Sequence, residues 1–322
     1  ISPFNVAGLK NLPLEKDSQW LSTPYVHENT FLTGFSHVNL SGVGCPDLGV
    51  ILLMPTTGEV ETNHLKYGST YSNEVAKAGY YSSIIDKYNV KGEFTTSTRV
   101  GVSKFTFPKG QSNILLNLGL GLTNEEGSMV KVISSTEIEG MRSVGSFCYN
   151  SPEAAYPVYF VAKFSKPADT FGVWKKPAKH EGVEAKWMTY NGKPRLMKQT
   201  TKMVVGDSIG TYFTYKFDKA ETIEVKIGIS YVSIKNAREN LRKETENKSF
   251  DRGNNTLNVF WVGVLLIALA VAAPWFNLTV SSPELVKSYI ASFGVSLLMF
   301  LSLYYKCNNS EVQLKINYIK SS

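Results

Sequence analysis

Apolar residues along most of this chain recur in short alternating or continuous runs, and glycine, proline and asparagine separate the runs. Alternation with a period of two predicts a half-buried strand, whereas a short uninterrupted run predicts a strand buried on both faces. From residue 79 onward we predict strands at Tyr80–Ile85, Val90–Val100, Val102–Phe107, Asn113–Leu118, Val130–Ile138, Val158–Phe164, Phe171–Trp174, Gly210–Phe217 and Ile223–Val232. So many strands with little helix between them predict a mainly β chain that forms a large antiparallel β-sandwich.

One stretch, Gly34–Gly58, combines a polar half with an apolar half. The apolar run Val50–Met54, which Pro55 ends, predicts a buried strand. The half before it is small, polar and rich in glycine, and a loop of this kind on a rigid strand is a common basis of binding sites. We therefore predict substrate-binding residues at His37, Asn39, Ser41, Gly42, Gly44, Cys45 and Asp47. An ordinary glycine-rich connection is the alternative.

Residues 1–33 show weak periodicity and several turn residues, which predict loops and short edge segments. Trp20, Tyr25 and His27 lie here, just ahead of the polar stretch. An aromatic ring beside a polar loop can stack on a sugar ring, although a tryptophan that covers the core is the more frequent role.

A short amphipathic helix follows the last predicted strand. Ile234, Ala237 and Leu241 fall on one helical face. We place the sandwich at residues 1–232 and this linker helix at residues 233–252.

The sequence beyond the linker has the hydropathy of membrane spans. Val259–Phe276 and Ser288–Tyr305 carry no charge, and each is long enough to cross a hydrocarbon layer of about 30 Å. We predict a two-helix transmembrane hairpin at residues 253–306 and a polar tail at residues 307–322. The hairpin would place residues 257–305 in a membrane, with the sandwich membrane-associated and extracytoplasmic. A buried helical hairpin in a soluble protein is the alternative.

Composition and charge narrow the classes of function. Of the 322 residues, 43% are hydrophobic and 19% are charged, which allows a sizeable core. The net charge of +7 is spread along the chain, so the clustered basic surface of a nucleic-acid-binding protein is not expected. The three cysteines are too few and too scattered to form a disulfide framework or a zinc site.

No catalytic machinery is visible in the residues themselves. Inverting glycoside hydrolysis needs two carboxyl groups about 6.5–9.5 Å apart. The available carboxylates show no spacing that selects a pair; they are Asp47, Asp86, Glu93, Asp207 and Asp218. The four histidines have no metal-ligand spacing. We therefore predict no catalytic residue and no metal ligand.

Several motifs occur in an order that resembles one enzyme family. They are GFSHVNLSGVGCPDLGVILLMPTTG at 34–58, NEVAKAGYY at 73–81, NILLNLG at 113–119, YFVAKFSKP at 159–167 and VKIGISYVSIKNA at 225–237. Together they cover residues 1 to about 250. This part of the chain resembles the N-terminal domain of family 92 glycoside hydrolases, the α-mannosidases.

The resemblance implies properties that composition does not show. Family members are exo-acting, calcium-dependent, inverting α-mannosidases that cleave α-1,2 or related linkages on mannans and N-glycans. Their β-sandwich lends loops to the mannose pocket, and an (α/α)6 barrel supplies the general acid, the general base and most calcium ligands. Here the uncharged segment follows the sandwich, so we expect the barrel to be missing and no calcium to bind this chain alone.

Three positions depart from the family pattern of the polar stretch. Asn39 stands in place of histidine, Val43 in place of threonine and Val50 in place of an acidic residue. We predict an N-terminal, carbohydrate-associated domain that lends loops to a mannose pocket and lacks the catalytic acid and base. A membrane-anchored mannose-binding module and a non-functional truncated or fused gene product are the alternatives.

Overall fold

The computed structural model describes residues 1–5, 25–27, 29–39, 48–122, 127–145, 155–175, 195–197, 202–246 and 250. All of them belong to one compact unit, Ile1–Gly253. Its first elements are β1 (Ser2–Pro3), β2 (Phe31–Leu32), β3 (Phe35–Ser36), β4 (Val38–Asn39), β5 (Leu48–Val50), β6 (Leu52–Thr57), α2 (His64–Tyr67), β7 (Ser69–Lys77), β8 (Tyr80–Ile85), the 3-10 helix η2 (Asp86–Tyr88), β9 (Val90–Thr96) and β10 (Val100–Phe107). The later elements are β11 (Gly110–Asn117), β12 (Ser128–Ser134), β13 (Glu137–Val144), β14 (Tyr156–Phe164), β15 (Thr170–Lys175), β16 (Arg195–Met197), β17 (Met203–Gly206), β18 (Ile209–Phe217), β19 (Glu221–Ser230) and α3 (Ile234–Thr245).

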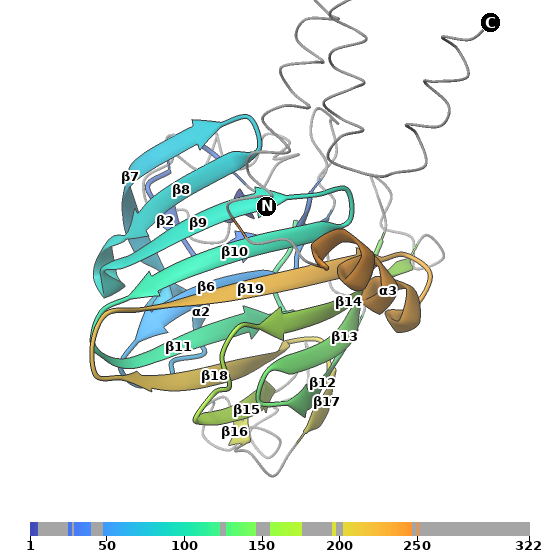
Figure 1. Cartoon of the computed structure of the whole chain (residues 1–322). Helices are drawn as coiled ribbons and strands as arrows, with labels where there is room; N and C mark the ends of the chain where they lie inside the picture. Colours follow the sequence, from blue (N-terminus) through green and yellow to red (C-terminus); the bar gives the residue numbers. More distant parts are fainter. Residues whose placement is uncertain are drawn as a thin grey trace, which may run out of the picture. The chain divides into compact units, whose positions relative to one another are not determined.

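The strands of the described residues form two large antiparallel sheets that pack as layers (Figure 1). One sheet has the order β1-β3-β6-β11-β18-β15-β16, and the other has the order β17-β12-β13-β14-β19-β10-β9-β8-β7-β2. Strands β4 and β5 form a separate two-stranded ribbon. The predicted mainly β chain with large antiparallel sheets is therefore confirmed.

The core lies between the two sheets, where their inward-facing side chains meet. In β10, Phe105 and Phe107 are buried while Thr106 between them is not, as the alternation predicts. Phe164 of one sheet stacks on Phe213 of the other, with their ring centroids 4.4 Å apart. Because aromatic pairs of this kind bury large areas, they hold the layers together.

The apolar run Val50–Met54 is buried as predicted, but it is not one strand. The chain leaves β5 after Val50 and enters β6 at Leu52, with Ile51 between them in a left-handed conformation at φ 58°. Nor does Pro55 end the strand, since β6 continues to Thr57. Pro55 pairs with Ile114 of β11, whereas β3 pairs with β6 at Phe35 and Leu53.

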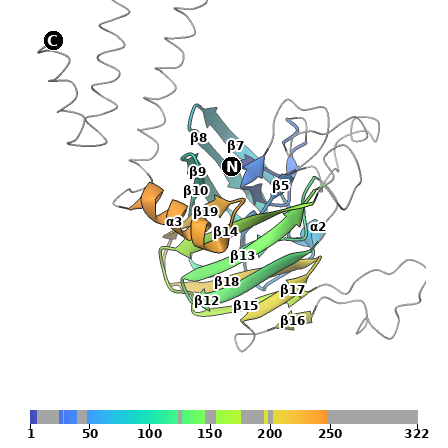
Figure 2. The ribbon, with the colours of Figure 1, turned by 90° about the vertical axis from the view of Figure 1, so that its right-hand side faces the viewer.

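The predicted helix is confirmed as α3, and the sequence explains both its start and its position (Figure 2). The Ser233 side chain caps it by accepting from the Asn236 N–H at 3.1 Å. Ala237 and Leu241 are buried against β10 and β14. A Cβ atom at Gly228 of β19 would lie 2.6 Å from the Ala237 carbonyl oxygen, so this glycine allows the helix to approach the sheet.

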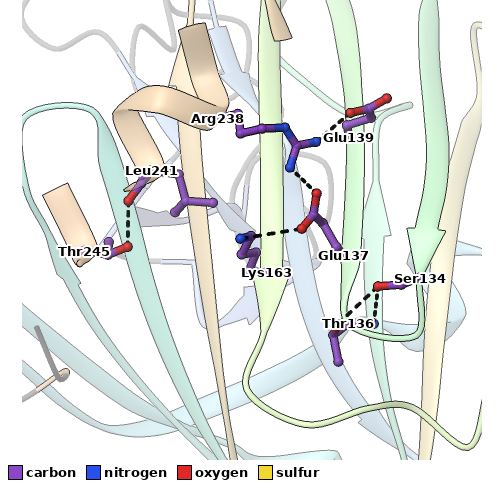
Figure 3. A network of polar contacts seen from close by, with 8 residues as sticks. All are labelled: Ser134, Thr136, Glu137, Glu139, Lys163, Arg238, Leu241 and Thr245. Atoms are coloured by element: carbon purple, nitrogen blue, oxygen red, sulfur yellow. Dashed lines mark hydrogen bonds and ion pairs between the residues drawn. The ribbon is translucent and has the colours of Figure 1, made fainter. Parts of the chain in front are cut away.

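Ion pairs fasten the polar side of α3 to the same sheet (Figure 3). The Arg238 guanidinium contacts Glu137 and donates to Glu139 at 2.7 Å, and Lys163 lies 3.6 Å from Glu137. Desolvation opposes the charge of Arg238, but the two carboxylates outweigh it and raise the pKa of the guanidinium. The helix is therefore held both by its apolar face and by a network of charges.

The predicted transmembrane hairpin is not supported, and the fold prediction is corrected in this respect. The two α-helices of the described residues span four and twelve residues, and neither is long and apolar enough to cross a membrane. Helix α3 is amphipathic and lies on the sheet. Residues 253–306, the predicted hairpin, and the membrane contact at 257–305 lie outside the described residues. A lack of charged residues shows that a segment is hydrophobic, but hydrophobicity alone does not establish a helix. The predicted domain boundaries stay predictions.

Candidate functional site

The predicted binding loop leaves the sandwich after β4 and returns at β5. Asn39 pairs with Leu48, and Val38 pairs with Val50, so the two ends of the loop are held side by side. Two of the seven predicted binding residues, His37 and Asn39, lie on the described ends of this loop. The other five lie outside the described residues; they are Ser41, Gly42, Gly44, Cys45 and Asp47.

His37 is fixed at the base of the loop by two hydrogen-bond contacts, and its ring lies close to Gly101. Its backbone N–H donates to the Val50 carbonyl oxygen at 2.9 Å, and its Nδ1 lies 2.9 Å from the Ile51 carbonyl oxygen. A Cβ atom at Gly101 of β10 would lie 2.7 Å from Cδ2 of the imidazole. Gly101 therefore leaves the space that the ring occupies, which is why a glycine stands inside β10.

The protonation state of His37 follows from its burial. Desolvation lowers the pKa of the imidazole to about 3, so the ring is neutral near pH 7. Because Nδ1 faces a carbonyl oxygen, it carries the proton, and Nε2 is left as an acceptor. Among the described residues Nε2 is buried and has no hydrogen-bond partner. His37 is thus a neutral, buried imidazole just before the loop.

The return of the loop is strained. Leu48 and Ile51 are left-handed at φ 64° and 58°, although neither is a glycine. Such a conformation is most unfavourable for a β-branched residue such as Ile51, and it persists only where the surroundings hold it. The hydrogen bond from His37 to the Ile51 carbonyl oxygen is part of that support. Gly49, at φ 65°, supplies the remaining left-handed turn.

Asn39 is half-buried where the loop begins, at the end of β4. Its Oδ1 accepts from the hydroxyl of Ser36, in β3, at 2.8 Å. Among the described residues the amide Nδ2 of Asn39 has no acceptor. Asn39 is therefore oriented by the protein and keeps a free donor.

Of the five carboxylates considered from the sequence, Asp47 lies outside the described residues, and the other four have different surroundings. Asp86 accepts from Ser72, and Glu93 is bound by Tyr80 and two lysines. Asp207 and Asp218 lie in exposed turns of the sheets. The described residues also contain no group of three or more His, Cys, Asp or Glu side chains that could hold a metal ion.

Sequence reasoning missed one exposed carboxylate, Glu74 of β7. Its two oxygens accept from the hydroxyls of Tyr25 and Tyr81, at 3.1 and 2.7 Å. Tyr25 and His27, considered above as sugar-stacking aromatics, therefore lie in this cluster, whereas Trp20 lies outside the described residues. The family resemblance offered a signal, because Glu74 falls within the matched motif at 73–81.

Comparisons with known proteins show the family and the fold of this domain. The model of the glycosyl hydrolase family 92 N-terminal domain matches residues 7–230. The family GH92 α-mannosidase BT3965 from Bacteroides thetaiotaomicron, in complex with mannoimidazole, is 28% identical with a TM-score of 0.62, and the match covers 74% of this chain and 31% of that chain. The family GH92 glycosyl hydrolase ccman5 is 26% identical with a TM-score of 0.62, over 74% of this chain and 31% of its own.

A third structure, the inverting mannosidase BT2199 from Bacteroides thetaiotaomicron, is 18% identical with a TM-score of 0.59 over 74% of this chain and 29% of its own, and it shows the likeness of fold alone. No curated protein matches. The chain thus spans less than a third of the length of these solved relatives, and it matches only the N-terminal part of their chains. Since the family model covers more than half of the chain, this protein belongs to glycoside hydrolase family 92 through its N-terminal domain.

Proposed function

We propose that this sandwich is the sugar-facing, carbohydrate-associated domain of an α-mannosidase and that its polar loop lines part of a mannose pocket. The observation that carries the proposal is the strained loop base, where His37 holds the left-handed Ile51 through its carbonyl oxygen. Strain of this kind persists where a particular backbone geometry is required, and it is common at ligand sites. The family and the mannosidase relative at 28% identity supply the class of ligand.

The loop has the chemistry that a sugar requires. Hydroxyl groups of a pyranoside are both donors and acceptors, so a pocket needs small polar groups on a rigid support. We propose that Asn39 contributes a donor and that His37 holds the start of the loop in place. We propose that Ser41, Gly42, Gly44, Cys45 and Asp47 complete the lining, with the glycines leaving room for the sugar.

Hydrolysis requires groups that the described residues do not bring together. An inverting enzyme needs a general acid and a general base about 6.5–9.5 Å apart, with a water molecule between them. We propose that both belong to the catalytic domain of a complete family 92 enzyme, as does the calcium ion that the family resemblance implies. The described sandwich would then bind mannose-containing glycans without cleaving them. An extracytoplasmic location stays a prediction.

Calorimetry with methyl α-mannoside and a separate hydrolysis assay test this division of labour. We expect saturable binding at millimolar ligand, because one domain supplies only part of the pocket, and weaker binding by His37→Ala and Asn39→Ala. No steady release of mannose from α-1,2-mannobiose is expected with or without calcium. Steady turnover by the purified chain would refute the division, and the absence of any binding heat would refute the role of the loop.

A further inference from the structure

The strand β7 carries an irregularity that redirects Glu74. The register between β7 and β8 shifts between Ser72 and Val75, and Asn73 within this bulge is left-handed at φ 50°. A bulge adds a residue to one strand and re-aims the side chains beside it, and bulges are frequent next to binding sites. Glu74 is exposed on this bulge rather than paired within the regular ladder.

Two tyrosines hold the Glu74 carboxylate in one orientation. Tyr25 donates to Oε2 and Tyr81 donates to Oε1, so each oxygen already accepts one hydrogen bond. The Tyr25 hydroxyl also lies 3.0 Å from Nδ1 of His27. A carboxylate has about four lone-pair sites, so two acceptor positions remain, one on each oxygen. These two positions point in fixed directions because the tyrosines restrain the group.

A neighbouring carboxylate shows what an ordinary structural role looks like here. Glu93 of β9 also accepts from a tyrosine hydroxyl, that of Tyr80, but Lys91 and Lys104 pair with it at 3.2 and 3.5 Å. Among the described residues Glu74 has no ion pair. Its charge is therefore restrained by hydrogen bonds without being neutralised, which leaves it able to accept from an external donor.

The cluster lies at the same end of the sandwich as His37. Tyr81 of β8 pairs with Phe94 of β9, and Phe94 pairs with Ser103 of β10, two residues from the Gly101 that faces His37. The ring centroid of Tyr81 lies 6.5 Å from that of Phe35, which is two residues before His37. The Tyr81 partner of Glu74 and His37 thus belong to neighbouring parts of the fold.

We propose that Glu74, oriented by Tyr25 and Tyr81, accepts hydrogen bonds from two adjacent hydroxyl groups of a pyranoside. Two oxygens with one free position each match a vicinal diol, whose two hydroxyls donate side by side. The partly exposed tyrosine rings and His27 supply apolar faces for the C–H groups of the sugar. The class of ligand, a mannoside, rests on the proposed function, whereas the role of Glu74 rests on the cluster itself.

Titration of the full chain with methyl α-mannoside, followed by NMR, tests the proposal. Glu74→Gln should weaken binding at least about tenfold, because the amide donates where the sugar hydroxyl must donate. Glu74→Asp keeps the charge but shortens the side chain by one methylene, and it should weaken binding by a similar factor. Glu93→Gln is the matched control and should bind as the wild type does. Circular dichroism of each variant checks that it is folded.

The outcomes separate this proposal from that for the polar loop. Loss of binding by Glu74→Gln with retention by Glu93→Gln supports the role of Glu74. If both Glu74 variants bind as the wild type does while His37→Ala loses binding, the role of Glu74 is refuted and the loop proposal stands. If the wild type binds no mannoside, both proposals are refuted.

Discussion

Replacing Gly101 with alanine tests whether His37 supports the base of the polar loop. The new methyl group would lie 2.7 Å from Cδ2 of the imidazole, closer than carbon atoms approach. The ring must move, and its hydrogen bond to the Ile51 carbonyl oxygen is then lost. Overpacking costs about 1–3 kcal/mol and a lost hydrogen bond about 0.5–1.5 kcal/mol, so the free energy of unfolding should fall by about 2–4 kcal/mol.

Urea unfolding followed by tryptophan fluorescence measures this loss, and a double-mutant cycle identifies its cause. In a His37→Ala background the methyl group at residue 101 meets no ring, and the cost of Gly101→Ala should drop by at least about 1.5 kcal/mol. Val204→Ala, in the edge strand β17, is the control and should be additive with His37→Ala. Additive costs for Gly101→Ala and His37→Ala would refute the link between the two residues.

Three further predictions follow from other contacts. Burial lowers the pKa of His37 to about 3 in the folded protein, whereas its pKa in the unfolded chain is about 6.5. The contribution of His37 to the free energy of unfolding is therefore complete above about pH 6.5 and is lost as the pH falls toward 3. Urea unfolding of His37→Asn should show a smaller loss of stability over this range. Leu241→Ala removes a buried side chain from beneath α3 and should lower the free energy of unfolding by about 2–4 kcal/mol in urea, with a smaller loss for the half-buried Ile234→Ala. Chelation of calcium should leave the thermal midpoint unchanged, and a shift reversed by added calcium would contradict the assignment of calcium to another domain.

The strand prediction succeeded where the local pattern of apolar residues decides the structure. Tyr80–Ile85 is β8 with the predicted bounds, and the buried run at 113–118 forms most of β11. The prediction failed at Val90–Val100, which was taken as one strand. The chain turns between Thr96 and Val100, where no glycine or proline marks the turn.

The reason for that failure is a contact that the local sequence does not contain. Glu244 of α3 accepts from the Ser97 hydroxyl and from both the backbone N–H and the guanidinium of Arg99. A residue about 145 positions away therefore supports the turn. Local pattern rules weigh only neighbouring residues, so they continue the strand through it.

The candidate site divides in the same way. The polar loop was found from its composition, because small polar residues before an apolar run are visible in one dimension. Glu74 was missed, since a single glutamate in a strand is ordinarily a solvated side chain. Its restraint by Tyr25 and Tyr81 depends on a bulge and on the fold, which together bring positions 25, 74 and 81 to one place.

The sequence alone determined the mainly β class and the helix at 234–245, because periodicity and capping act over a few residues. The tertiary structure decided the order of the strands, which places β6 beside β11 and β19 between β14 and β10. It also decided that His37 is buried, which lowers the pKa of its imidazole, and that Ile51 is left-handed. Hydrophobic patterning selects which residues are buried, and only the packed sheets select which of them meet.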